Sequence, residues 1–118
     1  MINLLMYCLT LNPNHLGSIK KLGYLPVGLG DSNFSNKWLT DKTNTNISHK
    51  NKFYGEYTFH YWLWKNNLNN IPDGWIGFCQ YRKFWAKNHA QNILTFSDLN
   101  NCTLKNLPDK YNDYESIV

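Results

Sequence analysis

The sequence has few cysteines and no apolar run long enough to cross a membrane. Of its 118 residues only three are cysteine, and Cys8, Cys79 and Cys102 lie far apart, without the paired spacing typical of a zinc site. The apolar run at residues 2–11 has no basic segment before it and no small-residue cleavage motif after it, so a secretory signal is not indicated. A bilayer span needs roughly 20 apolar residues. We therefore expect a cytoplasmic protein with reduced cysteines.

A concentrated block of basic charge is also missing. The formal net charge is +4, and the positive residues are spread along the chain. This distribution suits a phosphate-bearing small molecule or an anionic membrane surface as well as nucleic acid. Because no RNA-binding motif, zinc finger or basic helix is visible, we do not expect a nucleic-acid partner. The glycines at residues 28–32 lack the rest of a dinucleotide or phosphate-loop motif, which favours a plain turn.

Aromatic residues are abundant, at 16% of the chain, and can supply much of the core of one modest domain. Apolar segments predict strands near residues 2–9, 24–28 and 75–82. Residues 12–17 predict a turn region, and the polar residues 33–45 predict a surface loop. Apolar strands separated by a helix indicate an α/β fold with a mainly parallel sheet.

The stretch from residue 46 to 66 predicts the central helix of that fold, capped by Ser48 or Asn51. Apolar residues fall on nearly every side of this helix: Tyr54, Tyr57, Phe59, Tyr61, Trp62, Leu63 and Trp64. Such a helix is expected to be buried all round. Farther on, residues 97–99 predict the cap of a short helix, residues 107–111 a loop, and residues 116–118 the beginning of a strand.

The predicted strand at residues 75–82 begins apolar and ends in polar and cationic residues. Gln80, Tyr81, Arg82 and Lys83 stand at its carboxyl end. In open parallel sheets, ligands bind beyond the carboxyl ends of the strands. Arginine pairs bidentately with phosphate, and lysine contributes a point charge. The strand end is therefore a candidate site for an anionic ligand, although the same charges can simply close a strand in solvent.

The stretch from residue 46 to 85 resembles a family of bacterial glycosyltransferases of capsular polysaccharide and exopolysaccharide biosynthesis. Many members of this family are described only as a domain of unknown function. The matching residues occur in the family's order: Asn46, Ile47, Ser48, Lys50, Asn51, Tyr54, Glu56, Thr58, Tyr61, Trp62, Trp64, Lys65, Asn66, Tyr81 and Arg82. The chain departs from the pattern at Gln80, where the family has histidine, at Lys83, where it has arginine, and at Tyr57, where it has leucine.

The resemblance implies a fold and a reaction. Family domains are considerably longer, so residues 1–118 are expected to be the N-terminal part of a single glycosyltransferase-like domain. The expected fold is a partial, truncated nucleotide-sugar-binding sheet of the GT-A-like kind. The implied reaction moves a sugar from a nucleotide-sugar donor to a saccharide or lipid-linked acceptor, in capsular polysaccharide, exopolysaccharide or lipopolysaccharide biosynthesis. Peripheral contact with the inner face of the membrane is part of this expectation.

The resemblance also implies roles for residues. No Asp-x-Asp metal motif is present, so we expect no metal or cofactor, and Arg82 is predicted to neutralise the diphosphate with help from Lys83 or Lys50. Glu56 is predicted to act as a base or to accept a sugar hydroxyl. The remaining predicted substrate contacts are Asn51, Tyr54, Gln80 and Tyr81.

Each of these roles has a plain structural alternative. Glu56 can be a carboxylate paired with a lysine, an arginine or His60, because burying it alone is costly. Asn51 can cap the helix, and the aromatic residues can be core. For the whole chain, the alternative to an active enzyme is an inactive truncated remnant or a carbohydrate-binding module.

Overall fold

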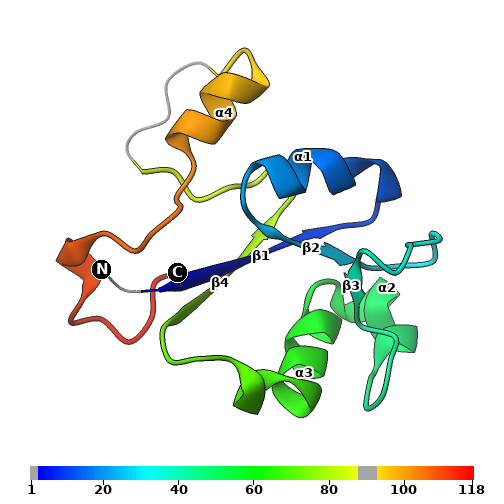
Figure 1. Cartoon of the computed structure of the whole chain (residues 1–118). Coiled ribbons are helices and arrows are strands. Elements are labelled where there is room, and N and C mark those ends of the chain that lie inside the picture. Colours follow the sequence, from blue (N-terminus) through cyan, green and yellow to red (C-terminus); the bar gives the residue numbers. More distant parts are fainter. Residues whose placement is uncertain (1–2, 88–92) are drawn as a thin grey trace.

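The computed structural model describes residues 3–87 and 93–118. Four strands form one all-parallel sheet in the order β3-β2-β1-β4 (Figure 1). The strands are β1 (Leu4–Thr10), β2 (Leu25–Gly28), β3 (Leu39–Thr40) and β4 (Trp75–Gln80). The predicted α/β fold with a mainly parallel sheet is therefore confirmed, and three of its strands match the predicted segments.

Strand β1 is apolar because it lies inside the sheet, with β2 on one side and β4 on the other. Its alternate side chains enter two separate core layers, as the pleat of a strand requires. Met6 and Cys8 pack into the layer that also contains Ile19, Leu22, Tyr24, Trp38 and Cys79. Tyr7 and Leu9 pack into the opposite layer, with Val27, Leu29, Phe59, Trp62 and Leu63. Two-sided burial explains why the β1 segment is almost continuously apolar.

Helices cover both faces of this sheet (Figure 1). Helix α1 (Leu16–Lys21) follows a 3-10 turn (Pro13–His15) and supplies the buried Ile19. Helix α3 (Tyr57–Asn66) lies on the other face. The sequence predicted only a turn where α1 begins and a loop where β3 lies. Both elements are short, six and two residues, so neither carries a full period of apolar residues.

The helix predicted within residues 46–66 is in fact two helices, preceded by a 3-10 turn at Ser48–Lys50. The short helix α2 (Asn51–Tyr54) ends at Gly55, whose φ of 56° lies in the left-handed region, and α3 begins at Tyr57. Neither Ser48 nor Asn51 caps a helix with its side chain as predicted. Instead, Asn51 Nδ2 donates to Gly55 O at 2.9 Å and to Thr58 Oγ1 at 3.1 Å. The asparagine therefore bridges the break between the helices.

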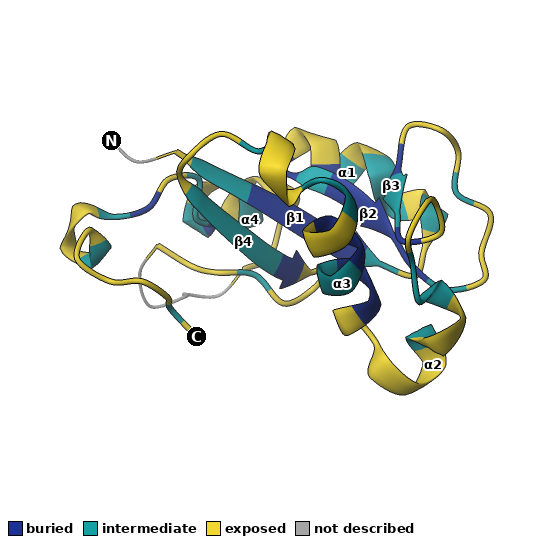
Figure 2. Ribbon diagram, turned by 90° about the horizontal axis from the view of Figure 1, so that it is seen from below, coloured by how far each residue is buried: buried dark blue, intermediate teal, exposed yellow. Residues whose placement is uncertain are grey.

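The prediction that this helix is buried all round is wrong. Phe59, Trp62 and Leu63 face the sheet and are buried, but Tyr57 and Trp64 are 64% and 60% exposed. Tyr54 in α2 is also exposed. A single helix lying on one face of a sheet has no second layer to cover its outer side, and the described residues provide none (Figure 2).

The C-terminal part forms helix α4 (Phe96–Cys102) and a 3-10 turn (Asp109–Tyr111). The cap of α4 is Thr95 rather than the predicted Ser97, and Thr95 and Asp98 form a reciprocal capping box. Residues 116–118 form no strand, so that prediction is wrong. Tyr24 Oη donates to Leu104 O at 2.5 Å, which attaches this part to the sheet layer.

We expect Gly55→Ala to lower the free energy of unfolding by about 1–3 kcal/mol, because a side chain at this positive φ is strained. A Cβ at this position would meet no atom within 4 Å, so the effect isolates backbone conformation from crowding. The matched control is Gly17→Ala in α1, where a Cβ also meets nothing and φ is not positive. Urea unfolding should show Gly17→Ala to be neutral or stabilising, and equal effects of the two changes would contradict this explanation.

Candidate functional site

The order of the strands creates a natural binding position at one edge of the sheet. The chain runs outward from β1 to β2 and β3, and then returns past β1 to form β4 on its other side. The carboxyl ends of β1 and β4 therefore lie next to each other where the direction of winding reverses. In open α/β sheets, ligands bind in the crevice outside such a switch point.

A crevice of about 550 Å³ lies at this position, and we call it the strand-end crevice. Its walls come from the end of β1, the end of β4 and the α2–α3 junction. The polar and charged residues among its lining are Thr10, Asn12, His15, Asn51, Lys52, Glu56, Gln80 and Tyr81. Its size suits a small organic ligand.

Glu56 stands at the N-terminal boundary of α3 and faces the end of β4. Gln80 Nε2 donates a hydrogen bond to Glu56 Oε2, which joins the start of α3 to the last residue of the strand. Glu56 is half-buried. Within the described ranges its hydrogen-bonded partner is thus the Gln80 amide, and not the lysine, arginine or His60 of the structural alternative. A carboxylate at a crevice wall can accept a hydrogen bond from a ligand hydroxyl or take its proton.

His60 lies one turn beyond Glu56 on α3. Its ring packs on Phe78, with ring centroids 4.1 Å apart, and Nε2 has no hydrogen-bond partner in the described part of the chain. Burial lowers the pKa of His60 below 6.5, and the nearby Glu56 opposes this only in part. The histidine is therefore mainly neutral at pH 7, and it serves as packing against β4.

His15 and Tyr81 form the aromatic wall of the crevice. Their rings stack with centroids 3.8 Å apart and an angle of 19° between planes. His15 Nδ1 lies 2.7 Å from Thr10 Oγ1, which orients the imidazole at the end of β1. Burial, and then the positive charge of Arg82, lower the pKa of His15. His15 was missed by sequence reasoning because it lies in the segment predicted as a turn.

Arg82 and Lys83 diverge immediately after β4. The predicted strand to residue 82 ends at Gln80, because Lys83 N donates to Gln80 O at 2.8 Å and Arg82 adopts a φ of 85°. This turn places Arg82 in a neighbouring cavity with His15 and Tyr81, while Lys83 lines a groove with Glu56 and Gln80. The two cationic side chains predicted together at the strand end therefore lie on different sides of the crevice.

Of the remaining predicted site residues, only some lie in the strand-end crevice. Asn51 lines the strand-end crevice, whereas Lys50 and Tyr54 are exposed and line none of the described cavities. The cation that does line the crevice is Lys52, which sequence reasoning did not single out. The sequence around Lys52 did not indicate this position, because the end of α2 at Gly55 determines which side of α2 faces the crevice.

A buried polar group supports the crevice wall from beneath. Asp41 is 0% exposed, and Thr58 Oγ1 donates to Asp41 Oδ2 at 2.5 Å. The same Thr58 oxygen accepts from Asn51. Asp41 therefore positions Asn51 through Thr58, which ties the loop after β3 to the α2–α3 junction. Sequence reasoning missed Asp41 because it lies inside the predicted surface loop.

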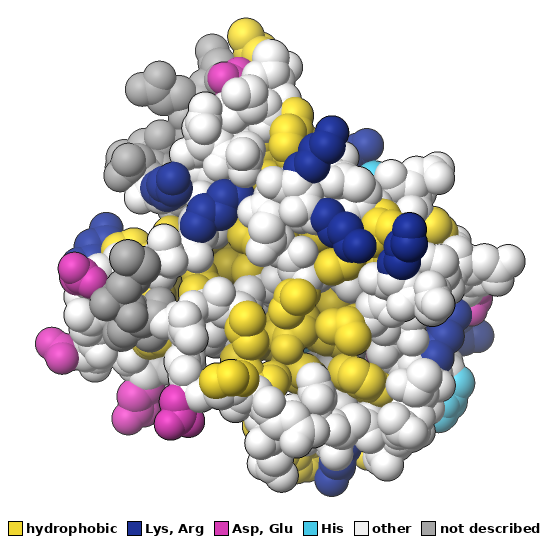
Figure 3. Space-filling view, viewed as in Figure 1, with side chains coloured by type: hydrophobic (Ala, Val, Ile, Leu, Met, Phe, Trp, Pro, Cys, Tyr) yellow, Lys and Arg dark blue, Asp and Glu magenta, His cyan; other side chains and the backbone are white. Residues whose placement is uncertain are grey.

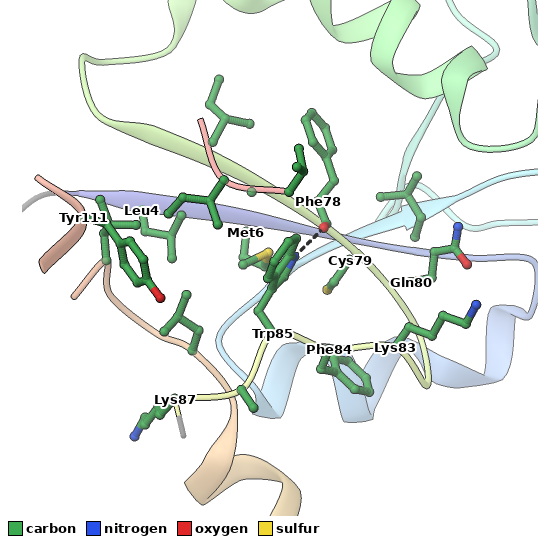
Figure 4. A pocket seen from close by; sticks show the side chains of 18 of the residues that line it. Leu4, Met6, Phe78, Cys79, Gln80, Lys83, Phe84, Trp85, Lys87 and Tyr111 are labelled. Carbon is green, nitrogen blue, oxygen red and sulfur yellow. Dashed lines mark hydrogen bonds between the residues drawn. The ribbon is translucent and has the colours of Figure 1, made fainter. Parts of the chain in front are cut away.

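A larger groove of about 870 Å³ follows the outer side of β4. Figure 3 shows hydrophobic side chains gathered between β4 and α3 on this face. Met6, Phe78 and Trp85 line the groove, and Trp85 Nε1 donates to Phe78 O at 2.9 Å (Figure 4). The indole thereby satisfies a carbonyl on the outer strand of the described sheet. The groove is mainly apolar and offers little chemistry of its own.

In residues 3–87 and 93–118, no cluster of three or more His, Cys, Asp or Glu side chains is arranged to hold a metal ion. Over the same ranges, no helix has the length and apolar character needed to cross a membrane.

The fold and the crevice together define an α/β protein with a candidate ligand site at the carboxyl ends of parallel strands. Residues 9–118 match DUF4422, a domain of unknown function, and the chain belongs to this family. No curated protein and no solved structure matches the chain.

Proposed function

We propose that the protein is a glycosyltransferase, or the N-terminal part of one, that uses a nucleotide-sugar donor and has a GT-A-like fold. The acceptor is a saccharide or a lipid-linked saccharide, in the synthesis of capsular polysaccharide, exopolysaccharide or lipopolysaccharide on the cytoplasmic side of the membrane. The observation that carries this proposal is the position of Glu56, hydrogen-bonded to Gln80 at the switch point of a parallel sheet.

Transfer from a nucleotide-sugar requires that the negative charge of the diphosphate leaving group be stabilised. Lys52 in the crevice and Arg82 beside its aromatic wall are suited to this task, and Lys83 approaches from the groove side. The stacked pair of His15 and Tyr81 offers a flat surface for a base or a sugar ring.

Glu56 supplies the acid–base group of this proposal. Its carboxylate accepts the proton of the acceptor hydroxyl, whose oxygen then forms the new bond to the sugar carbon while the bond to the nucleoside diphosphate breaks. Gln80 holds the carboxylate in place at the end of β4. Asn51, tied through Thr58 to Asp41, is positioned to hold a sugar hydroxyl at the same wall.

The test combines nucleotide-sugar binding with release of the nucleoside diphosphate. Glu56→Gln retains an acceptor for the Gln80 amide and removes only the charge. We expect it to bind the donor within a few-fold of wild type and to lose about 10²–10⁴-fold in turnover. The matched control is Asp98→Asn, which removes a carboxylate that lines none of the described cavities and should leave turnover unchanged.

Three outcomes decide the proposal. Turnover that is lost in Glu56→Gln and kept in Asp98→Asn supports it. Absence of any nucleotide-sugar binding, or equal turnover in the two variants, overturns it. Donor or saccharide binding without turnover in the wild-type chain favours a carbohydrate-binding module or an inactive remnant.

A further inference from the structure

Outside the core, α2 and α3 carry aromatic side chains bordered by lysines, of which Phe53, Tyr57 and Trp64 are exposed and Tyr61 is half-buried. We call this surface the aromatic–lysine face and define it by Lys52, Phe53, Tyr57, Tyr61, Trp64 and Lys65. Figure 2 views the molecule from the side on which both helices lie. Tyr57, Tyr61 and Trp64 belong to the stripe that the sequence predicted to be core. Phe53, which that prediction did not include, is 77% exposed.

Helical geometry makes the α3 part of this face continuous. Tyr57, Tyr61 and Trp64 follow one another at spacings of four and three residues, on the side opposite Phe59 and Leu63. The rings of Tyr61 and Trp64 meet edge to face, with centroids 6.0 Å apart. These side chains therefore form a row along the outer side of the helix, while the opposite side belongs to the core.

The lysines of the face lie against its aromatic rings. Lys65 Nζ is 3.9 Å from the centroid of Trp64, and Lys52 Nζ is 5.3 Å from the centroid of Phe53. Each ammonium group therefore lies close to an aromatic ring. Proteins that bind at a membrane surface place lysine and aromatic side chains together in this way, next to the lipid headgroups.

We propose that the aromatic–lysine face docks on an anionic lipid bilayer. Exposed apolar patches of this kind mark interaction sites. Tyrosine and tryptophan have apolar bodies and polar tips, which suit the boundary between headgroups and acyl chains. Lysines beside them attract anionic headgroups and add to the apolar contribution.

Charge selects the lipid surface over a neutral polysaccharide, which would also stack on aromatic rings. The face as defined carries two lysines and no carboxylate, and residues 42–70 as a whole contain four lysines and one carboxylate, Glu56. The Glu56 carboxylate is hydrogen-bonded to Gln80. A neutral polymer makes no use of this excess of lysines, whereas an anionic bilayer does. Lys52 and Gly55 also line the strand-end crevice, so docking would hold that crevice near the membrane surface.

The first test is sedimentation of the protein with vesicles of phosphatidylcholine alone or mixed with phosphatidylglycerol. We expect binding to the mixed vesicles only, decreasing as salt is added. The double variant Lys52→Glu/Lys65→Glu should bind at least about tenfold more weakly, since each lysine near an anionic surface contributes about fivefold. The matched control is Lys20→Glu/Lys21→Glu, which makes the same charge change on α1 across the sheet and should retain most of the binding.

The second test locates the contact. Trp64→Ser should weaken vesicle binding and reduce the quenching of tryptophan fluorescence by brominated phosphatidylglycerol. Tyr114→Ser, at an exposed aromatic residue elsewhere, should change neither property. Circular dichroism of each variant shows whether the fold is retained.

The proposal is overturned if wild type binds no anionic vesicles, or if the α1 and α2–α3 charge variants lose binding equally. Binding to an insoluble neutral polysaccharide that depends on Trp64 but not on the lysines would assign the face to saccharide instead. These measurements do not involve sugar transfer, so they can support or contradict membrane docking whether or not the proposed enzymatic function is correct.

Discussion

Replacing Phe59 by alanine is expected to lower the free energy of unfolding by about 3–5 kcal/mol, the range for deleting a buried aromatic side chain. Phe59 is 0% exposed and connects α3 to the sheet. Its ring contacts those of Tyr7, Trp62 and Phe78, with centroids 5.4, 5.7 and 6.3 Å away. A cavity at this position would remove contacts in the core layer that holds α3 against the sheet.

The matched control is Tyr57→Ala, two residues away on the same helix. Tyr57 is 64% exposed, so its removal should cost less than about 1 kcal/mol. Urea unfolding monitored by circular dichroism gives both values. A loss at Tyr57 as large as the loss at Phe59 would mean that the outer side of α3 is covered in solution and that the present description of this helix is wrong.

Replacing Arg82 by alanine is expected to weaken nucleotide-sugar binding by about 1.5–3 kcal/mol, roughly ten- to a hundredfold, if Arg82 makes a charge-assisted pair with the diphosphate. Arg82 is exposed, and its charge already acts on His15 in the crevice wall. Stability should change little, because the side chain packs into no core layer. Calorimetric titration with a UDP-sugar measures the effect.

Two controls separate the role of Arg82 from general charge. Arg82→Lys should recover only part of the lost affinity, because lysine lacks the planar fork. Lys20→Ala on α1 should leave affinity unchanged. Equal affinity in wild type and Arg82→Ala would remove Arg82 from the site, and binding abolished by a chelator would replace it with a metal ion as the diphosphate partner.

Strands β1, β2 and β4 were predictable because each of them is a short apolar run bounded by turn residues. Strand β1 shows this most clearly, since burial on both faces leaves no polar position between Leu4 and Leu9. Helix α1 and strand β3 were not predictable, because six and two residues are too few to show a period. Their stability comes from packing against the sheet and not from local pattern.

The error at residues 51–66 has a different cause. Because aromatic residues occur on every side of this segment, the sequence predicted a helix that is buried all round. The isolated Gly55 was compatible with a continuous helix. The structure uses Gly55 to end α2 and leaves Tyr57 and Trp64 in solvent, with Tyr61 half-buried between them. Composition cannot distinguish a core stripe from an exposed aromatic surface when both contain tyrosine and tryptophan.

The candidate site was predictable at the level of the strand end but not residue by residue. Gln80 and Glu56 were selected from the sequence, and their contact depends on the return of the chain to β4 beside β1. His15 and Lys52 entered the crevice only through three-dimensional arrangement. A tight turn at residues 80–83 places Arg82 and Lys83 on different sides.

The central claim is that the strand-end crevice binds a nucleotide-sugar, and backbone NMR during titration with a UDP-sugar tests it most directly. The account predicts saturable shifts of amide signals at residues 10–15, 51–56 and 80–82, with the C-terminal 3-10 turn at residues 109–111 unchanged. Absence of shifts across nucleotide-sugars that differ in base and sugar, or saturable shifts confined to α4 and the C-terminal turn, would contradict it.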